Sequence, residues 1–354
     1  MTLSSAAAWI APDDEVDRGN LLGAATATAQ RETRELGAII EGTGELEAAL
    51  AAARETGLLI IPESGQVLPG AAEELALLER ARREGWRLLL LSLGADSTSC
   101  SGELVERLFR RLAATPDSCE APLPPAALRR RVAAGTESMF RRSGRMHVEC
   151  FETCLLEAGA SLAASASVLD WGAGCGRMTA HLTARAPHAF IVAADTDAEA
   201  IAWVGEHLEV GAARVLPLRP PTTLQDDAFD TVIGHSVFSH LDIDAQDQWL
   251  QELSRITQRG GLLALSFNGP VALRWHREHP LIDLPDSIED DLLRDGIAIW
   301  REDGWEKEFY EGYHTTFHRH DYIRDHWSAC GVEVIAVHEA AALPTQDIAV
   351  LRSR

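Results

Sequence analysis

The stretch SVLDWGAGCGR, Ser167 to Arg177, decides the fold of the second half of this chain. An apolar run ends in an acid, Asp170, and glycines follow at every second position: Gly172, Gly174 and Gly176. A turn rich in glycine lets the backbone adopt positive φ and approach a ligand closely. In open parallel sheets such turns connect a first strand to a first helix beside the ligand. The stretch therefore predicts a strand, a ligand-binding turn and a helix.

The spacing of these glycines is GxGxG. A dinucleotide fold needs GxGxxG, and its third glycine would fall where this chain has Arg177. The tighter spacing therefore disfavours NAD and a nucleotide-dependent oxidoreductase. A glycine triplet alone is a weak signal, because tight helix packing can also require it.

From Ser167 onward, strand-like and helix-like segments alternate. This alternation is typical of an α/β fold, a Rossmann-like, mostly parallel sheet with helices on both faces. Strands are expected at residues 167–172, 189–197, 213–218, 229–238 and 260–269, with helices between most of them.

Polar residues stand at the ends of two further strands. The apolar run FIVAAD ends at Asp195, where a carboxylate can accept both ribose hydroxyls of a nucleoside. Asp197 is instead expected to cap the following helix. The next motif, FDTVIGHSVFSHLD, places Asp230 at a strand start and His235, Ser236 and His240 at its carboxyl end. Three polar elements thus converge at one edge of the sheet.

The N-terminal part carries no chemistry that its sequence reveals. Residues 14–54 are rich in Ala, Leu and Glu and are expected to be helical. The apolar runs near residues 58 and 87 flank a helical segment and predict a parallel strand–helix–strand unit. A proline-rich break at residues 114–126 predicts a linker. We expect an accessory domain, α/β or helical, at residues 1–120 and a second domain at 126–354.

The second domain resembles the class I S-adenosylmethionine-dependent methyltransferases. The resemblance rests on VLDWGAGCGR, VAADTD, FDTVIGHSVFSHL and RGGLLALSF, which occur in the family's order and spacing. PPAALR and FRRSGR, ahead of the glycine motif, are similar to motifs of a bacterial subgroup that acts on small molecules. The resemblance implies S-adenosylmethionine as cofactor, S-adenosylhomocysteine as product and a C-terminal antiparallel hairpin.

The resemblance also implies roles for individual residues. Asp170 and the glycine turn would hold the methionine part of the cofactor, Asp195 the ribose, and the backbone near His235 the amino group. The full expected cofactor set is Asp170, Gly172, Ala173, Gly174, Gly176, Asp195, Thr196 and His235. The chain departs from many relatives at Leu218 and Arg219, where those relatives have an acid that binds adenine.

An insertion follows the fifth strand at about residues 268–319. It is long and aromatic enough to form a lid over the acceptor, although the same aromatics could simply form its core. The expected acceptor-binding residues are Asn268, Trp275, Tyr310, Tyr313 and His314.

A sulfonium methyl group is already activated, so the enzyme has mainly to align the acceptor and exclude water. A hydroxyl acceptor would also need a base, and histidine suits that task near neutral pH. The candidates are His235, His240 and His314. His240 could instead start a helix, and His314 could be an exposed polar residue.

The composition of the chain disfavours several classes of binding partner. A formal net charge of −22 disfavours nucleic acid, and no apolar run is long enough to span a membrane, so we expect a cytoplasmic protein. The six cysteines lack CxxC pairs and are expected to be reduced thiols, with Cys150 and Cys154 buried and no metal bound.

The expected function is methyl transfer to an oxygen or nitrogen of a small molecule, either a secondary-metabolite or a sugar-like intermediate. A peptide or protein acceptor stays open, as do a non-catalytic cofactor-binding partner protein and a homodimer formed through the N-terminal domain.

Overall fold

The computed structural model describes residues 4–12, 18–62, 67–68, 70–91, 95–98, 102–114, 119–132, 136–278, 283–301, 313–342 and 345–354. The chain divides into two compact units. Residues 1–117 and 134–142 form unit 1, and residues 118–133 and 143–354 form unit 2. Tyr310, expected in the acceptor set, lies outside the described residues.

Unit 1 is an α/β unit built on a sheet with the strand order β2-β1-β3-β4-β5. The first four strands pair in parallel, and β5 pairs antiparallel with β4. Its strands are β1 (Ser4–Ile10), β2 (Arg34–Glu41), β3 (Leu58–Ile61), β4 (Arg87–Leu90) and β5 (Ala95–Asp96). Its helices are α1 (Arg18–Arg31), α2 (Leu46–Thr56), α4 (Ala71–Glu84) and α5 (Gly102–Ala114).

The helical prediction for residues 14–54 is wrong in its middle. Strand β2 separates α1 from α2, and its residues alternate between half-buried and exposed. That period of two is the strand pattern, and it places Leu36, Ala38 and Ile40 on one face. Strand β1 was not foreseen either, because its alanines have little strand propensity. Small side chains nevertheless suit a central strand that is buried on both faces.

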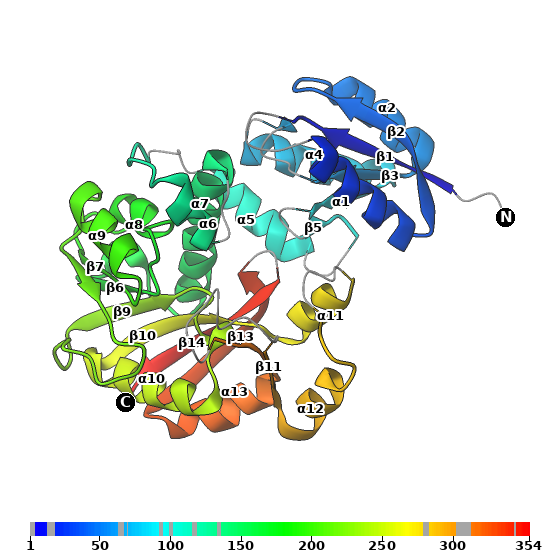
Figure 1. Ribbon diagram of the computed structural model, residues 1–354. Helices are drawn as coiled ribbons and strands as arrows, with labels where there is room; N and C mark the ends of the chain where they lie inside the picture. The colour runs from blue at the N-terminus through cyan, green and yellow to red at the C-terminus, as the bar shows by residue number, and fades with distance from the viewer. Residues whose placement is uncertain are drawn as a thin grey trace. The chain divides into compact units, whose positions relative to one another are not determined.

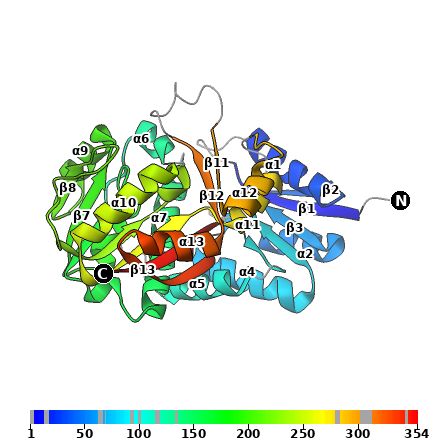
Figure 2. The ribbon, with the colours of Figure 1, turned by 90° about the horizontal axis from the view of Figure 1, so that it is seen from below.

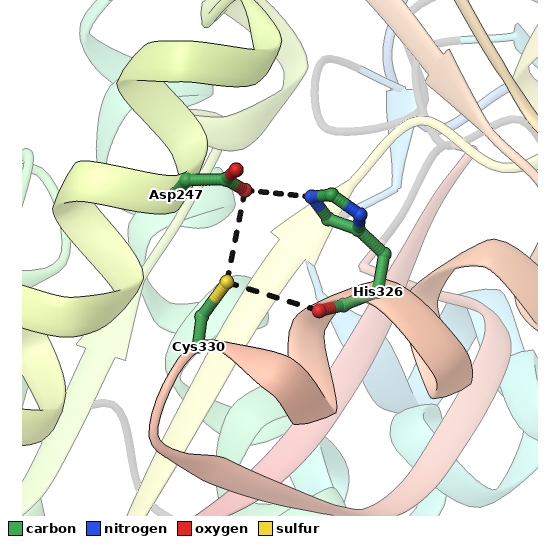
Figure 3. Close-up of side chains that lie close together, drawn as sticks. All are labelled: Asp247, His326 and Cys330. Carbon is green, nitrogen blue, oxygen red and sulfur yellow. Dashed lines mark hydrogen bonds and ion pairs between the residues drawn. The ribbon is translucent and has the colours of Figure 1, made fainter.

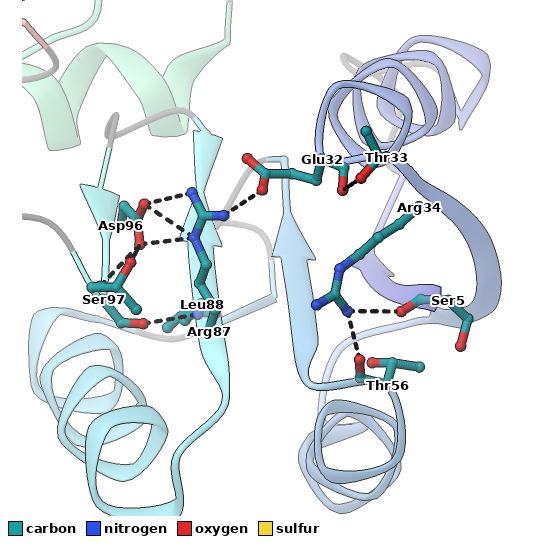
Figure 4. A network of polar contacts seen from close by, with 10 residues as sticks. Ser5, Glu32, Thr33, Arg34, Thr56, Arg87, Leu88, Asp96 and Ser97 are labelled. Carbon is teal, nitrogen blue, oxygen red and sulfur yellow. Dashed lines mark hydrogen bonds and ion pairs between the residues drawn. The ribbon is translucent and has the colours of Figure 1, made fainter. Parts of the chain in front are cut away.

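A polar network ties together the amino ends of the unit 1 strands (Figure 4). Arg87, at the start of β4, binds Asp96 at 2.7 Å and also pairs with Glu32 after α1. Arg34, at the start of β2, donates to the carbonyls of Ser5 and Thr56 at 3.0 and 2.6 Å. Each guanidinium therefore bridges segments that are distant in the sequence, which explains why arginine begins both strands.

Unit 2 contains a seven-stranded sheet with the order β13-β14-β10-β9-β6-β7-β8 (Figure 1). Strands β8, β7, β6, β9 and β10 are parallel, and β14 runs antiparallel between β10 and β13. This confirms the Rossmann-like sheet with a C-terminal antiparallel hairpin. The strands are β6 (Ser167–Trp171), β7 (Phe190–Asp195), β8 (Ala212–Val215), β9 (Phe229–Gly234), β10 (Thr257–Phe267), β13 (Val332–Ala342) and β14 (Gln346–Ser353).

The helices of unit 2 connect these strands. Helices α10 and α13 lie over the same face of the sheet (Figure 2). Beneath them a core cluster gathers Trp171, Phe238, Trp249, Phe267 and Trp327. The helices are α6 (Ala126–Arg131), α7 (Glu137–Glu157), which begins in unit 1, α8 (Thr179–Arg185), α9 (Ala198–His207), α10 (Ile243–Ile256) and α13 (His320–His326), with short 3-10 turns η2 (Leu162–Ala164), η3 (Phe238–His240) and η5 (Trp327–Ala329).

The insertion after β10 has elements and a core of its own. It contains α11 (Pro270–Glu278), α12 (Ile288–Asp295) and an antiparallel pair, β11 (Ile297–Trp300) with β12 (Thr315–His318). Leu273, Ile288, Leu292 and Phe317 pack together there, with Trp300 against them. Trp300 and Phe317 thus serve the insertion's own packing, as the alternative interpretation of its aromatics expected.

No helix within the described residues combines the length and apolar character needed to cross a membrane.

A buried ion pair joins α13 to β14. Nε2 of His320 lies 2.5 Å from a carboxylate oxygen of Asp347, whose side chain is fully buried. The same carboxylate makes a second hydrogen bond, because Oδ1 of Asp347 accepts from the backbone N–H of Ala340 at 2.8 Å. The hydrogen bond to Asp347 raises the pKa of His320 above its usual 6.5.

This pair predicts a specific pH dependence of stability. A folded-state pKa above the unfolded value means that the pair stabilises fully below about pH 6.5 and loses its effect as pH rises through the raised pKa. His320→Gln should therefore lower the thermal midpoint most at mildly acidic pH, by the equivalent of about 1–2 kcal/mol. Thermal unfolding of parent and variant from pH 5.5 to 9 measures this, and a difference that grows with pH would contradict it.

Candidate functional site

The glycine turn lies at the carboxyl end of β6, as the sequence predicts. Its glycines all have positive φ, and the N–H groups of Gly172 and Ala173 donate to the Ala194 carbonyl at 2.8 and 3.1 Å. A Cβ on Gly172 would lie 2.3 Å from a methyl carbon of Val237, in the loop after β9. The turn therefore binds to β7 on one side and packs against the β9 loop on the other, which only glycine permits.

Two helices ahead of β6 pack onto this turn. A Cβ on Gly144 in α7 would lie 2.1 Å from the Arg177 carbonyl oxygen, so the glycine of FRRSGR allows α7 to touch the turn. Pro125 of PPAALR directly precedes α6, and Val132, which follows α6, would touch a Cβ on Gly174 at 2.6 Å. Both motifs thus belong to segments that pack against the glycine turn.

Asp195 joins the glycine turn to the end of β7. Its Oδ2 accepts from the Gly174 N–H at 2.7 Å, and its Oδ1 accepts from the Asp197 N–H at 2.9 Å and, more weakly, from the Thr196 hydroxyl at 3.4 Å. Each oxygen keeps acceptor capacity for a further donor. Asp197 caps α9 by accepting from Glu199 N and Ala200 N, both at 3.1 Å, which confirms its expected role.

Asp170 is buried behind the turn, where it accepts from the Thr179 hydroxyl at 2.6 Å. Burial raises the pKa of Asp170 to about 6. Burial likewise lowers the pKa of Arg177 to about 10, although the charges of Cys175 and Asp170 oppose this. Arg177 follows the last glycine of the turn and lies near Ser143 and His235, a position that the glycine spacing alone does not predict.

His235 follows β9 and turns its ring toward α7. The ring lies against His147, with centroids 3.9 Å apart, and its Nδ1 is 3.4 Å from Nη2 of Arg177. Burial, and then the nearby His147 and Arg177, lowers the pKa of His235 well below 6.5. The structure therefore holds this ring in contacts with α7 and Arg177.

A network that the sequence did not reveal fixes the β9 loop. Ser236 has φ of 59°, uncommon for a residue with a side chain. Its N–H donates to Oγ of Ser266 at 2.7 Å, and Gln346 accepts from Ser266 and donates to the Ser236 hydroxyl. Strands β10 and β14 thus hold the left-handed residue in place. Only the fold brings these three residues together, since Gln346 is 110 residues from Ser236.

His240 contacts the insertion. Its Nδ1 lies 2.9 Å from the carbonyl oxygen of His314, which can only accept, so Nδ1 carries the proton and Nε2 has a lone pair. The Tyr313 hydroxyl is 3.1 Å from this Nε2, and the two rings stack with centroids 4.3 Å apart. Burial lowers the pKa of His240 to about 4, and it also lowers the pKa of His314. His240 is therefore neutral at neutral pH.

The other predicted acceptor residues lie at the base of the insertion. Asn268 is buried, and its Nδ2 donates to the Thr316 carbonyl at 3.2 Å, so its side chain holds β12 against the end of β10. Trp275 is half-buried on α11, with its ring edge-to-face against His276. The structure thus brings His240, Tyr313 and His314 together and leaves Trp275 in separate contacts.

The residues expected beside the adenine, Leu218 and Arg219, include no acid. Leu218 is half-exposed, and its carbonyl accepts from Nε1 of Trp249 at 3.3 Å. Arg219 pairs with Asp242 at 2.7 Å. An apolar side chain thus stands where many relatives have an acid.

These residues fit an adenosyl cofactor. The Asp195 carboxylate stands at the end of β7, bonded to the glycine turn, and both of its oxygens keep acceptor capacity for ribose hydroxyls. A chain without a carboxylate beside the turn would not fit.

Residues 168–261 match the family model described as a methyltransferase domain. Solved structures with a similar fold include protein PH0226 from Pyrococcus horikoshii, which is 16% identical, with a TM-score of 0.43 and coverage of 59% of this chain and 91% of that one.

A second is a 1,6-didemethyltoxoflavin-N1-methyltransferase from Burkholderia thailandensis with bound S-adenosylhomocysteine, 15% identical, with a TM-score of 0.40 and coverage of 66% and 92%. None of the curated proteins matches this sequence. The matched family model covers the glycine turn, Asp195 and the β9 loop together. Residues 168–261 thus match a methyltransferase domain, and the match spans the part of unit 2 that holds the predicted cofactor residues.

Proposed function

We propose that this enzyme methylates a hydroxyl oxygen of a small molecule, a secondary-metabolite or sugar-like intermediate, with the His240–Tyr313 pair as its base. The observation that carries the proposal is the Nε2 lone pair of His240. Its Nδ1 proton is committed to the His314 carbonyl, so Nε2 can only accept a proton.

The cofactor, when bound, supplies an electrophilic methyl group on sulfur. Asp195 would bind the ribose hydroxyls through its two oxygens, and Thr196 stands beside them. The glycine turn, with Asp170 behind it, would hold the amino-acid portion. These roles follow from the positions of the residues at the carboxyl edge of β6 and β7.

His240 can act as the base although its pKa is low. An alcohol oxygen that gains a methyl group while it keeps its proton becomes a strongly acidic oxonium, so even a weakly basic imidazole accepts that proton. An acceptor hydroxyl bonded to Tyr313 would pass its proton to the phenol oxygen as Tyr313 passes its own to Nε2. The bound cofactor would supply the methyl group for the new O–CH₃ bond, and its sulfur would keep the electron pair.

The insertion supports a small acceptor. Tyr313 and His314 immediately precede β12, which packs against β10 through Asn268, so the base pair lies where the insertion joins the strand ends. Nδ1 of His314 is buried and has no hydrogen-bond partner among the described residues, so an acceptor hydroxyl could pair with it. Both half-buried side chains favour an acceptor that is enclosed.

The −22 net charge also disfavours a polyanionic acceptor.

A peptide acceptor and a non-catalytic cofactor-binding role are the alternatives. Incubation with methyl-labelled cofactor and a panel of sugars, phenols, amines and peptides separates them. Label on a hydroxyl compound supports the proposal. Label on peptides alone, or on nothing while the cofactor still binds, contradicts it.

The first prediction concerns cofactor binding. Asp195→Ala should weaken S-adenosylhomocysteine binding by about 1.5–3 kcal/mol, because two charge-assisted hydrogen bonds to the ribose are lost. Calorimetry measures this, with NAD as a ligand that should not bind. Asp197→Asn is the matched control, because Asp197 caps α9 and should leave affinity nearly unchanged. Equal losses in both variants would move the ribose role away from Asp195.

The second prediction concerns the base. Tyr313→Phe keeps the stacked ring and removes only the hydroxyl, and His240→Gln removes the basic nitrogen. Each should lower kcat by about 10²-fold while the affinity for S-adenosylhomocysteine changes little. His207→Gln, an exposed position on α9, is the control.

The pH profile gives an independent check. Because burial lowers the pKa of His240 to about 4, its neutral form predominates above pH 5. The kcat step that belongs to His240 should therefore lie near pH 4 and not near the ordinary histidine value of 6.5, whereas a step near pH 6 that persists in His240→Gln belongs to Asp170, whose pKa burial raises to about 6. A kcat step near 6.5 that disappears in His240→Gln would show that the ring is not held as described.

A further inference from the structure

Three metal-binding residue types meet on the face of unit 2 that α10 and α13 cover (Figure 3). Asp247 comes from α10, His326 ends α13, and Cys330 follows η5. One ligand atom from each lies within 4.8 Å of the other two. Asp247 is 79 residues from His326 in the sequence, so only the fold brings these side chains together.

The side chains point toward one another. Oδ1 of Asp247 is 2.7 Å from Nε2 of His326 and 3.7 Å from Sγ of Cys330. A tetrahedral zinc ion with bonds of about 2.0–2.3 Å separates its ligand atoms by roughly 3.3–3.6 Å. The oxygen–sulfur distance of 3.7 Å is close to that range, the nitrogen–sulfur distance is at most 4.8 Å, and small side-chain rotations that open the oxygen–nitrogen hydrogen bond would bring all three ligand atoms to a zinc ion.

The surroundings hold the cluster in place and leave it accessible. The Tyr322 ring stacks on His326 with centroids 4.7 Å apart, which fixes the imidazole plane. Trp327, directly after His326, is fully buried in the main core. The side chains of Asp247 and His326 are each about one-third exposed, so a cation can reach them from solvent.

A surface cavity of about 450 Å³ adjoins the cluster. Cys330 is shared by both, and the cavity is otherwise lined by residues such as Gln251, one turn after Asp247 on α10, and Arg255. Cys330 lies two residues before β13, which runs parallel to β10, so the cavity lies near the amino ends of the strands. The methyl-transfer site lies at their carboxyl ends.

We propose that Asp247, His326 and Cys330 bind one divalent cation of the zinc type, with water from the adjoining cavity as fourth ligand. One thiolate, one imidazole and one carboxylate form a donor set that suits zinc better than the hard cations calcium and magnesium, which prefer oxygen alone. The cation would join α10 to the segment between α13 and β13. Its place apart from the glycine turn makes the role structural or regulatory, independent of the proposed methyl transfer.

The experiment uses the full chain without an affinity tag, reduced and stripped of metal with a chelator. Zinc is titrated against a chromophoric chelator, and cobalt(II) is added in parallel as a spectroscopic probe. We expect one tight equivalent of zinc, a thiolate-to-cobalt charge-transfer band and a higher thermal midpoint with zinc. Binding of S-adenosylhomocysteine by the stripped protein should stay as in the parent.

Three variants each remove one ligand: Cys330→Ala, His326→Gln and Asp247→Asn. Each should weaken zinc binding by more than the roughly 10–100-fold loss typical of an outer-sphere change, and Cys330→Ala should abolish the charge-transfer band. Asp244→Asn, exposed on the same helix, and Cys119→Ala, outside the cluster, are the controls and should bind zinc as the parent does.

The cavity left by Cys330→Ala is small, and Asp247→Asn and His326→Gln are half-exposed changes, so circular dichroism should show folded variants. Absence of a tight equivalent in the parent would overturn the site. Zinc binding that survives all three substitutions would also overturn it, because the cation would then sit on other residues.

Discussion

The hydrogen bond from the Gly174 N–H to the Asp195 carboxylate, 2.7 Å long, is the contact on which the cofactor edge of unit 2 depends. It joins the turn after β6 to the residue that ends β7, so the two halves of the edge cannot separate without breaking it. The bonds from Gly172 and Ala173 to the Ala194 carbonyl reinforce the same junction. Burial of Asp170 behind the turn then becomes possible, because Thr179 satisfies its carboxylate from α8. A charge-assisted bond in such a place also fixes the direction of both carboxylate oxygens before any ligand arrives.

The parts of this edge that the sequence predicts are those whose cause is local. An apolar run that ends in an acid and then glycines encodes β6 and its turn within eleven residues, and the order of alternating strands and helices sets the sheet. Asp197 was recognisable as a helix cap because capping involves residues two and three positions away. In unit 1 the same reasoning failed at β2, where an alternation of half-buried and exposed residues outweighed an alanine-rich, helix-like composition.

Contacts between distant residues could not be predicted. Ser236 holds a left-handed backbone because Ser266 and Gln346 bond to it, yet nothing near Ser236 in the sequence indicates either partner. His240 was a candidate base from its place after β9, but its tautomer depends on the His314 carbonyl, 74 residues away. The sequence also gave no reason to expect Asp247, His326 and Cys330 to meet. The spacing of cysteines reveals only ligands that are close in the sequence, whereas Asp247 lies on α10, His326 ends α13 and Cys330 follows η5.

The two ends of the unit 2 strands differ in a way that physical chemistry explains. At the carboxyl ends, the glycine turn and the Asp195 carboxylate lie side by side, and burial keeps His240 and His235 neutral there. A neutral imidazole can accept a proton beside a cationic cofactor without electrostatic repulsion, which a protonated histidine could not avoid. At the amino ends, Cys330 and its partners lie under helices that contribute to the core through Trp327 and Trp249. A ligand there would act on the packing of α10 against α13, whereas a ligand at the opposite ends would act on the chemistry. The two sites thus use different residues of unit 2, and a change in the packing around Cys330 need not disturb the groups around the glycine turn.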